Sequence, residues 1–258
     1  MPTQLSRIKK SLKQLLLKEV LHPLQKLPSE RALSALFATT RITLKEALSA
    51  LEIEGLIYRE ERRGWFVSPA RLIYNPLSRC HFHQLVKAQQ RSATTQVLGI
   101  KTQLADAQQS QLLALNKLTQ LHCISRLRCV DNRPVLYVQN CLISDLFPDI
   151  LQQDLSQSLT GLYQEKYGYH TSRSRFEVFP TGANKQVARA LNLAEGQQVL
   201  KICRVNYQQD GNIIDCEFEY WRPDAVLIRI DSSTEPIFQK NSCNPPPSFY
   251  KAASSPID

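Results

Sequence analysis

The chain has 258 residues, with 32 Lys and Arg against 23 Asp and Glu, a net charge of +9; this length allows one large domain or two ordinary ones. Residues 1–74 hold 13 Lys and Arg but only 7 Asp and Glu, so we expect an anionic partner there, and DNA fits better than a membrane surface. No apolar run approaches the roughly 20 residues of a membrane span. Seven cysteines without CxxC spacing predict reduced thiols in the cytoplasm.

Residues 3–22 have the pattern of an amphipathic helix, because apolar side chains recur on one face of it. These side chains are Leu5, Ile8, Leu12, Leu15, Leu16 and Val20. We expect this helix to pack on the segment that follows, with its lysines adding phosphate contacts.

Residues 27–67 are expected to form two short helices and a hairpin. Ser29 can cap the first helix and Thr40 the second. In the second, apolar residues recur at i, i+3, i+4 and i+7 from Leu44 to Leu51, which predicts a buried face. Gly55 ends that helix, and residues 56–59 and 64–67 read as strands around a charged turn. The same pattern fits an ordinary helical subdomain, so it does not by itself assign a function.

Four sequence motifs occur in order within residues 5–68: LPSER, TTRITLKEAL, EGLIYR and RRGWFV. In order and spacing they resemble the winged helix-turn-helix of the GntR family of bacterial transcription regulators. The resemblance implies that residues 1–68 form a DNA-binding domain.

Residues 69–79 carry two prolines and lose periodicity, which predicts a linker. Residues 80–231 predict an α+β domain with an antiparallel sheet. Its expected strands are 121–128, 134–142, 176–179, 198–208 and 213–221, and its expected helices are 155–167 and 184–193. Residues 232–258 contain few large apolar groups, and we expect a loosely ordered tail.

The second domain contains the words ISRLRCVDNRPVLYVQNCL, ALNLAEGQQVLKICR and EYWRPD. They resemble the UTRA effector domain, which follows the winged helix in the HutC branch of the GntR family. The resemblance implies a chorismate-lyase-like fold used as a sensor. TTRIT, RRGWFV and EYWRPD look most like regulators of phosphonate utilisation, especially of 2-aminoethylphosphonate.

The GntR motif implies that the DNA contacts lie at the start of the second helix and at the wing tip. The residues concerned are Arg31, Thr40, Arg41, Thr43, Lys45, Arg62, Arg63 and Gly64. Arginine suits bidentate recognition of guanine, and Thr and Lys suit phosphates. Lys45 stands where the family often has Arg, which favours phosphate contact there. Trp65 replaces the threonine of the usual wing and is expected to pack in the hairpin.

Arg126 and Arg128 alternate on one expected strand, so both guanidinium groups share a face and could hold a phosphate or phosphonate. A surface strand with paired charges fits the spacing equally well; the UTRA resemblance favours the anion site. The expected effector contacts are Thr94, Thr95, Arg126, Arg128, Arg173, Glu177, Glu219 and Tyr220. Thr94 and Thr95 are expected in a loop, Glu219 could accept an ammonium group, with Glu217 as the alternative, and Tyr220 also suits a core position.

Cys80, His81 and His83 lack the usual spacing of a structural zinc site, and we expect them to pack at the linker. No metal, cofactor or catalytic residue is expected, and Asp224 reads as a turn residue.

The expected function is a ligand-responsive transcription regulator and not an enzyme. It would bind a near-palindromic, double-stranded operator as a homodimer, and a small anionic effector, a phosphonate or a phosphorylated metabolite, would modulate it. Two alternatives remain open: an enzyme of the chorismate-lyase-like fold joined to a DNA-binding domain, and a DNA-binding module whose second domain only dimerises.

Overall fold

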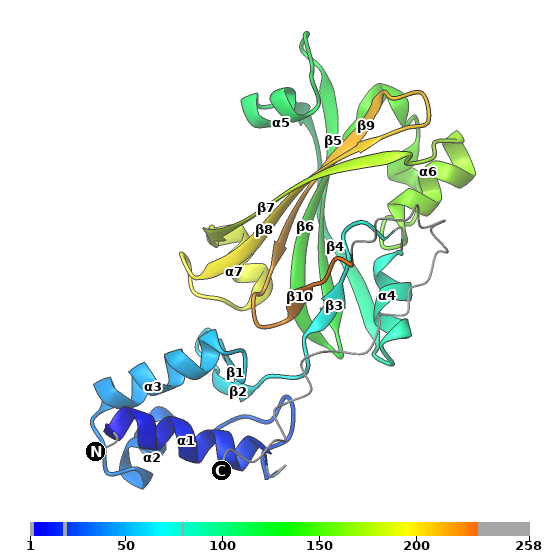
Figure 1. The fold of residues 1–258 in the computed structure, drawn as a ribbon. Coiled ribbons are helices and arrows are strands. Elements are labelled where there is room, and N and C mark those ends of the chain that lie inside the picture. The colour runs from blue at the N-terminus through cyan, green and yellow to red at the C-terminus, as the bar shows by residue number, and fades with distance from the viewer. Residues whose placement is uncertain (1–2, 18–19, 79, 232–258) are drawn as a thin grey trace.

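A computed structural model describes residues 3–17, 20–78 and 80–231. A small helical head lies at one end of a larger domain built on a twisted sheet (Figure 1). None of the described helices is long and apolar enough to cross a membrane. The expected tail, residues 232–258, falls outside the described residues.

The head consists of three helices and a hairpin. Its elements are α1 (Gln4–Leu17), α2 (Glu30–Leu36), α3 (Arg41–Ile53), β1 (Ile57–Glu60) and β2 (Gly64–Val67). The predicted apolar stripes form one core, in which Ile8 of α1, Leu33 of α2 and Leu48 of α3 are at most 2% exposed. Lys9 and Lys13 of α1 pair with Glu54 at 2.8 and 2.6 Å, so these two lysines tie α1 to α3.

The larger domain contains the remaining elements. Its helices are α4 (Phe82–Ala88), α5 (Ala107–Leu112), α6 (Leu159–Tyr167) and α7 (Lys185–Leu191), with the short 3-10 helices η1 (Ser144–Leu146) and η2 (Ile150–Gln152). Its strands are β3 (Leu72–Tyr74), β4 (Ala93–Leu104), β5 (Gln120–Val130), β6 (Arg133–Ile143), β7 (Arg173–Gly182), β8 (Gln198–Tyr207), β9 (Ile213–Trp221) and β10 (Val226–Ile228).

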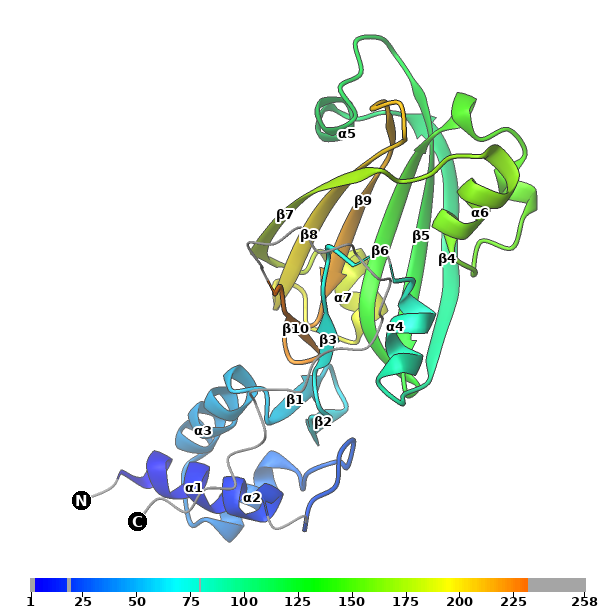
Figure 2. The ribbon, with the colours of Figure 1, turned by 45° about the vertical axis from the view of Figure 1, so that its right-hand side comes forward.

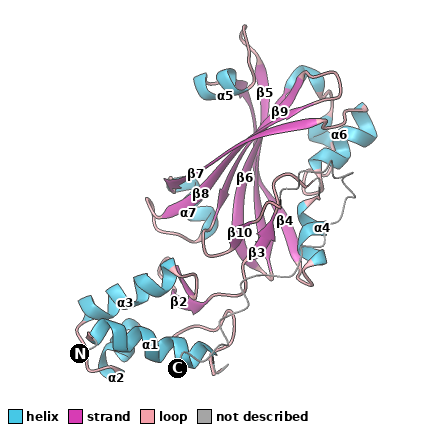
Figure 3. Cartoon of the chain, viewed as in Figure 1, coloured by secondary structure: helices cyan, strands magenta, loops and turns pink. Residues whose placement is uncertain are grey.

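Six of these strands form one antiparallel sheet in the order β4-β5-β6-β9-β8-β7. Figures 1 and 2 show α4, α6 and the β3–β10 pair on one side of the sheet, and α5 and α7 on the other. The cartoon in Figure 3 separates this strand-rich domain from the mainly helical head. The α+β prediction with an antiparallel sheet is therefore confirmed.

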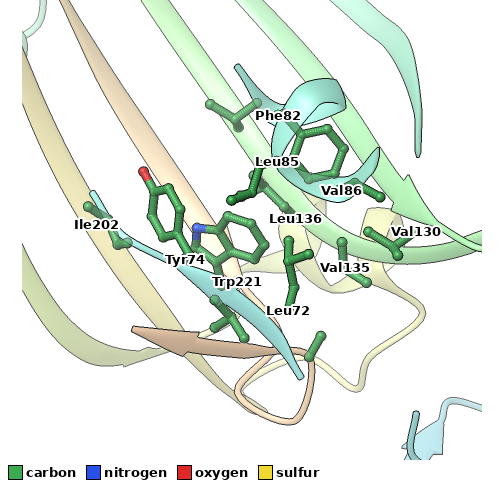
Figure 4. Packing of buried hydrophobic residues seen from close by; sticks show 13 residues of the cluster. Leu72, Tyr74, Phe82, Leu85, Val86, Val130, Val135, Leu136, Ile202 and Trp221 are labelled. Atoms are coloured by element: carbon green, nitrogen blue, oxygen red, sulfur yellow. The ribbon is translucent and has the colours of Figure 1, made fainter. Parts of the chain in front are cut away.

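The segment expected to be a plain linker takes part in the core of the larger domain. Residues 72–74 form β3, which pairs in parallel with β10. Leu72 and Tyr74 pack with Phe82 and Trp221, as Figure 4 shows. The rings of Tyr74 and Trp221 lie 5.3 Å apart. The apolar residues of β3 are too few to produce a clear periodic signal, and only the tertiary contact with β10 reveals the strand.

One further expectation needs correction. Thr94 and Thr95 lie within strand β4 and not in a loop. Five of the described cysteines have free thiols: Cys123, Cys129, Cys141, Cys203 and Cys216.

Candidate functional site

The N-terminal end of α3 presents exposed cations to solvent. Thr40 caps this helix by accepting a hydrogen bond from the Thr43 amide at 3.2 Å, and the two hydroxyl groups lie 3.0 Å apart. Arg41 and Lys45 are exposed, as is Arg31 in the first turn of α2. None of these three cations has an ion pair among the described residues. Their positive charge is therefore available to an external anion.

Ile42, which the sequence motifs did not single out, lies directly beside Arg41. Its side chain is 73% exposed. An exposed apolar group at the start of such a helix is suited to contact with a thymine methyl group. Ile42 is exposed because it lies on the side of α3 opposite the buried stripe that includes Leu44 and Leu48. The spacing of the apolar residues in the sequence already predicts this.

The hairpin β1–β2 is tied to the head by Trp65, whose indole donates to Glu30 Oε1 at 2.9 Å. Trp65 is 3% exposed, so its expected packing role is confirmed. At the hairpin tip Arg62 and Gly64 adopt positive φ values of 61° and 98°, which suits Gly and strains Arg. Arg62 and Arg63 are exposed, but Arg63 forms an ion pair with the buried Glu60.

A cavity of about 850 Å³ lies on the face of the sheet that also carries α4 and α6. Four arginines and two glutamates line it: Arg126, Arg128, Arg173, Arg204, Glu217 and Glu219. His81, His83 and Thr95 are also in the wall. The excess of cationic groups makes the cavity suitable for an anion.

Arg126 is a structural member of this wall. It is 2% exposed, its Nε donates to Asn140 Oδ1 at 3.0 Å, and its Nη1 donates to the Gln157 carbonyl at 3.0 Å. Burial and the neighbouring Arg128 lower the pKa of Arg126 to about 9. Arg126 therefore holds the loop before α6 against β5 while adding positive charge.

Arg128 is the less engaged cation. It forms no ion pair with any described residue, and its buried Nε lacks a hydrogen-bond partner. Its guanidinium lies 5.0 Å from the centre of the Phe82 ring. Burial lowers its pKa, although Glu217 and Glu219 oppose that effect. A buried donor without a partner in a cavity is a place where a ligand oxygen would be stabilised.

The two glutamates differ in their availability. Glu219 pairs with Arg204 at 2.8 Å and accepts a hydrogen bond from the Trp221 indole at 2.8 Å. Glu217 accepts a 3.3 Å hydrogen bond from Asn206 and has no ion pair within the described residues. Of the two, Glu217 is the acid better placed to meet a ligand ammonium group.

Three expected effector residues lie away from the cavity. Thr94, Glu177 and Tyr220 are each one position removed from cavity residues, namely Thr95, Phe176 and Glu219. Adjacent strand residues point to opposite faces, so these three side chains belong to the other face. Tyr220 packs there against Tyr137, with ring centres 6.1 Å apart, and Glu177 is paired with Cys203 in the β7–β8 register.

Several cavity residues were missed from the sequence. Arg204 of β8 lies opposite Glu217 of β9, and Asn206, two residues further along, lies on the same face of β8 as Arg204. Pairing the residues of the two expected strands across the turn Asp210-Gly211-Asn212 predicts that Arg204 and Asn206 lie beside the acidic residues of β9. His81 and His83 hydrogen-bond to Ser158 and Thr95, each at 2.9 Å, a pairing between distant segments that the sequence does not reveal.

Next to the cavity, the fully buried Asp215 accepts hydrogen bonds from Tyr163 at 2.9 Å and Asn206 at 2.7 Å. Burial and the nearby Glu217 raise its pKa to about 7. The folded-state value lies above the unfolded value of about 3.9, so the contribution of Asp215 to stability is greatest at acid pH and is lost as pH rises through about 7.

We therefore expect Asp215→Asn to raise the melting temperature relative to wild type more at pH 8 than at pH 5. The exposed Asp145→Asn serves as the control and should show no such trend. Thermal melts of the three proteins between pH 4 and pH 8 measure the effect. A difference between Asp215→Asn and wild type that does not change with pH would show that Asp215 is ionised throughout.

A three-helix head with a β-hairpin is joined to a sheet domain that holds a cavity lined by four arginines, and both parts match known protein families. Residues 4–67 match the family model of bacterial regulatory proteins, gntR family, and residues 88–226 match the UTRA domain. The chain belongs to the GntR family and carries a UTRA domain. It is a transcription regulator of a family that binds DNA and small-molecule effectors, and not an enzyme.

Named relatives agree with this assignment. The uncharacterized HTH-type transcriptional regulator YihL of Escherichia coli K12 is 28% identical over 208 residues, covering 80% of this chain and 88% of YihL. The HTH-type transcriptional repressor NagR of Bacillus subtilis is 27% identical over 210 residues, covering 81% and 86%. The crystal structure of PhnF from Mycobacterium smegmatis has the same fold, with a TM-score of 0.62, 20% identity, and coverage of 88% of this chain and all of PhnF.

Proposed function

We propose that this chain is a dimeric regulator that binds a near-palindromic operator and responds to a small anionic effector held in the 850 Å³ cavity. The observation that carries the proposal is Arg128, a cation in the cavity wall without an ion pair and with an unpartnered buried Nε. The proposed DNA-binding domain is residues 1–68, and the proposed effector domain is residues 80–231 together with β3 of the 69–79 segment, which pairs with β10.

Arg41 is proposed to read a guanine, and Lys45 to contact a phosphate. Both side chains are exposed at the start of α3, the part of a second helix that reaches base edges in a helix-turn-helix. Thr40 and Thr43 are engaged in the cap and are suited to phosphate contacts. The contact with the DNA backbone would be extended by Arg31 on α2 and by Arg62, Arg63 and Gly64 at the tip of the wing.

For Arg41→Ala we expect specific operator binding to weaken by about 1–3 kcal/mol, because a bidentate contact to guanine is lost. Gel shifts with the selected operator and with a scrambled duplex measure the specific part. Arg189→Ala removes an equal charge from an exposed position on α7 and should leave binding unchanged. Equal operator affinity for Arg41→Ala and wild type would exclude this use of α3.

Dimerisation is supported by exposed apolar side chains on the two edge strands of the sheet. Leu98 and Ile100 of β4 and Phe179 of β7 are 40–42% exposed. Edge strands with apolar groups tend to be covered by another chain, and a two-fold dimer would match a palindromic operator. Sedimentation of the full chain as a monomer at micromolar concentration would contradict this proposal.

The effector is proposed to be a phosphonate or phosphorylated metabolite. Arg128, with Arg126 and Arg173 in the same wall, would bind its anionic end, with Thr95 adding a hydroxyl donor. If the effector carries an ammonium group, as 2-aminoethylphosphonate does, Glu217 is the proposed acceptor, because Glu219 is already paired with Arg204. If the second domain only dimerises, ligands will leave operator affinity unchanged.

A further inference from the structure

A tyrosine of the wing is buried between two arginines of the effector domain. Tyr58 of β1 is 2% exposed. The Arg133 guanidinium lies 3.6 Å from the centre of its ring, and that of Arg222 lies 5.1 Å away. The Phe66 ring stacks on Tyr58 within the hairpin at 5.4 Å. Tyr58 therefore links the head to the larger domain through ring–guanidinium contacts.

A buried acid pairs with both arginines, and two backbone carbonyl groups hold Arg222 in addition. Asp224 forms ion pairs with Arg133 and with Arg222. Arg222 also donates to the Leu191 carbonyl at 2.8 Å and, across the domain boundary, to the Arg59 carbonyl at 2.9 Å. We call Tyr58, Arg133, Arg222 and Asp224 the clasp. All four are at most 7% exposed.

The clasp lies at the ends of strands that also carry the cavity wall. Arg222 directly follows Trp221, which lines the cavity and donates to Glu219. The Arg222 amide donates a hydrogen bond to the Val135 carbonyl at 3.0 Å, near the start of β6. Arg133 begins β6, and β5, its hairpin partner, bears Arg126 and Arg128. A shift of β5 or β9 on ligand binding would reach Arg133 or Arg222 within a few residues of backbone.

The rest of the boundary between the domains is less closely packed. A cleft of about 320 Å³ separates α3 from the loop before β8, with Lys45, Arg59 and Glu195 among the residues that line it. The wing tip is held by one backbone hydrogen bond, from the Glu61 amide to the Asn192 carbonyl at 2.9 Å, and Gln197 donates to Glu52 at 3.3 Å. The polar contacts between the described residues of the head and those of the larger domain therefore lie mainly at the wing, and α3 borders the cleft.

We propose that the clasp transmits the state of the cavity to the DNA-reading head and the state of the head to the cavity. This rests on the proposed function. Its four members are positioning residues, because they touch neither the cavity space nor the exposed end of α3. Buried ion pairs rarely add more stability than apolar packing would, and a polar contact that can exchange partners suits two discrete arrangements.

The test uses hydrogen exchange of the full chain, read by mass spectrometry in residues 126–128 and 155–158 of the cavity wall. Wild type is compared with Tyr58→Leu, which removes the ring, and with Tyr58→Phe, which keeps it. Each protein is measured alone and with an operator duplex selected from random DNA. Coupling between sites is reciprocal, so DNA at the head must be felt in the cavity if the clasp transmits.

In wild type and Tyr58→Phe we expect the duplex to change exchange in the cavity wall by about fivefold or more, the lower end of ordinary coupling. In Tyr58→Leu this change should be absent, and without DNA its cavity wall should already exchange differently from wild type. Arg133→Met, which leaves Asp224 paired with Arg222, is the second variant should Tyr58→Leu fail to fold.

A cavity response to DNA that survives in Tyr58→Leu, or one that is absent from wild type although exchange in α3 is slowed, would overturn the role of the clasp. Slowed exchange in α3 reports DNA binding in the same samples. If the duplex does not slow exchange in α3 of wild type, the proposed DNA reading is wrong. The comparison of wild type with Tyr58→Leu in the absence of DNA would still decide whether Tyr58 affects the cavity wall.

Discussion

Replacing Asp224 with alanine is expected to lower the free energy of unfolding by about 3–5 kcal/mol, because it leaves two buried arginines without their shared counter-ion. Arg133 and Arg222 are 4% and 1% exposed. Their charges hold the pKa of Asp224 below its usual value, although burial alone would raise it. The loss should therefore be large at neutral pH, and urea unfolding of the full chain measures it.

Asp145→Ala is the matched control, since Asp145 is exposed and forms no ion pair with a described residue. Its effect should stay within about 0.5 kcal/mol, as for other surface substitutions. The low folded-state pKa of Asp224 also predicts that its contribution falls as pH drops below the unfolded value of about 3.9. A small effect of Asp224→Ala at pH 7 would mean that water reaches the two arginines in solution.

Arg128→Met is expected to remove the thermal stabilisation that a phosphonate or phosphorylated ligand confers. A ligand at 100 times its Kd stabilises the folded state by about 2.7 kcal/mol, and that gain should disappear when the unpaired cation is replaced. Thermal melts with a panel of phosphonates, sugar phosphates and carboxylates, including 2-aminoethylphosphonate, identify the ligand in wild type and test the variant.

Arg175→Met provides the comparison, because Arg175 is an exposed arginine of the same sheet that does not line the cavity. It should keep the full ligand-induced shift. Wild-type stabilisation that survives in Arg128→Met would place the anion elsewhere, with Arg173 the next cavity arginine to replace. A second comparison, Glu217→Gln against Glu219→Gln, separates the acid that meets an ammonium group from the one that holds Arg204.

The cavity shows where prediction from the sequence stopped. Arg126 and Arg128 were correctly placed on one strand face, because two residues of one strand need no knowledge of any other strand. Thr95 and Glu219 line the cavity as predicted, but their neighbours Thr94 and Tyr220 do not, and Glu177 was predicted where Phe176 lines it. The resemblance supplied a segment but not the side of the sheet. A shift of one residue reverses the face of every side chain in a strand. Only the register between distant strands determines which residue of each pair enters the cavity.

Asp224 illustrates the same limit for stability. In the sequence it reads as a turn residue after Arg222 and Pro223, and nothing nearby indicates that it is buried. Its partner Arg133 lies 91 positions earlier, and the carbonyl that Arg222 contacts lies 163 positions earlier. These separations place the clasp beyond any local pattern.

The sequence alone determined the head, because its caps and apolar stripes involve residues three and four positions apart: Ser29 and Thr40 cap α2 and α3 as expected. It also determined the α+β class of the second domain through alternation within each strand. The tertiary structure decided which residues line the cavity and that β3 of the expected linker joins the core. It also decided how Tyr58 ties the head to the sheet. Those features depend on which distant strands lie side by side, and a long-range register leaves no trace in local spacing.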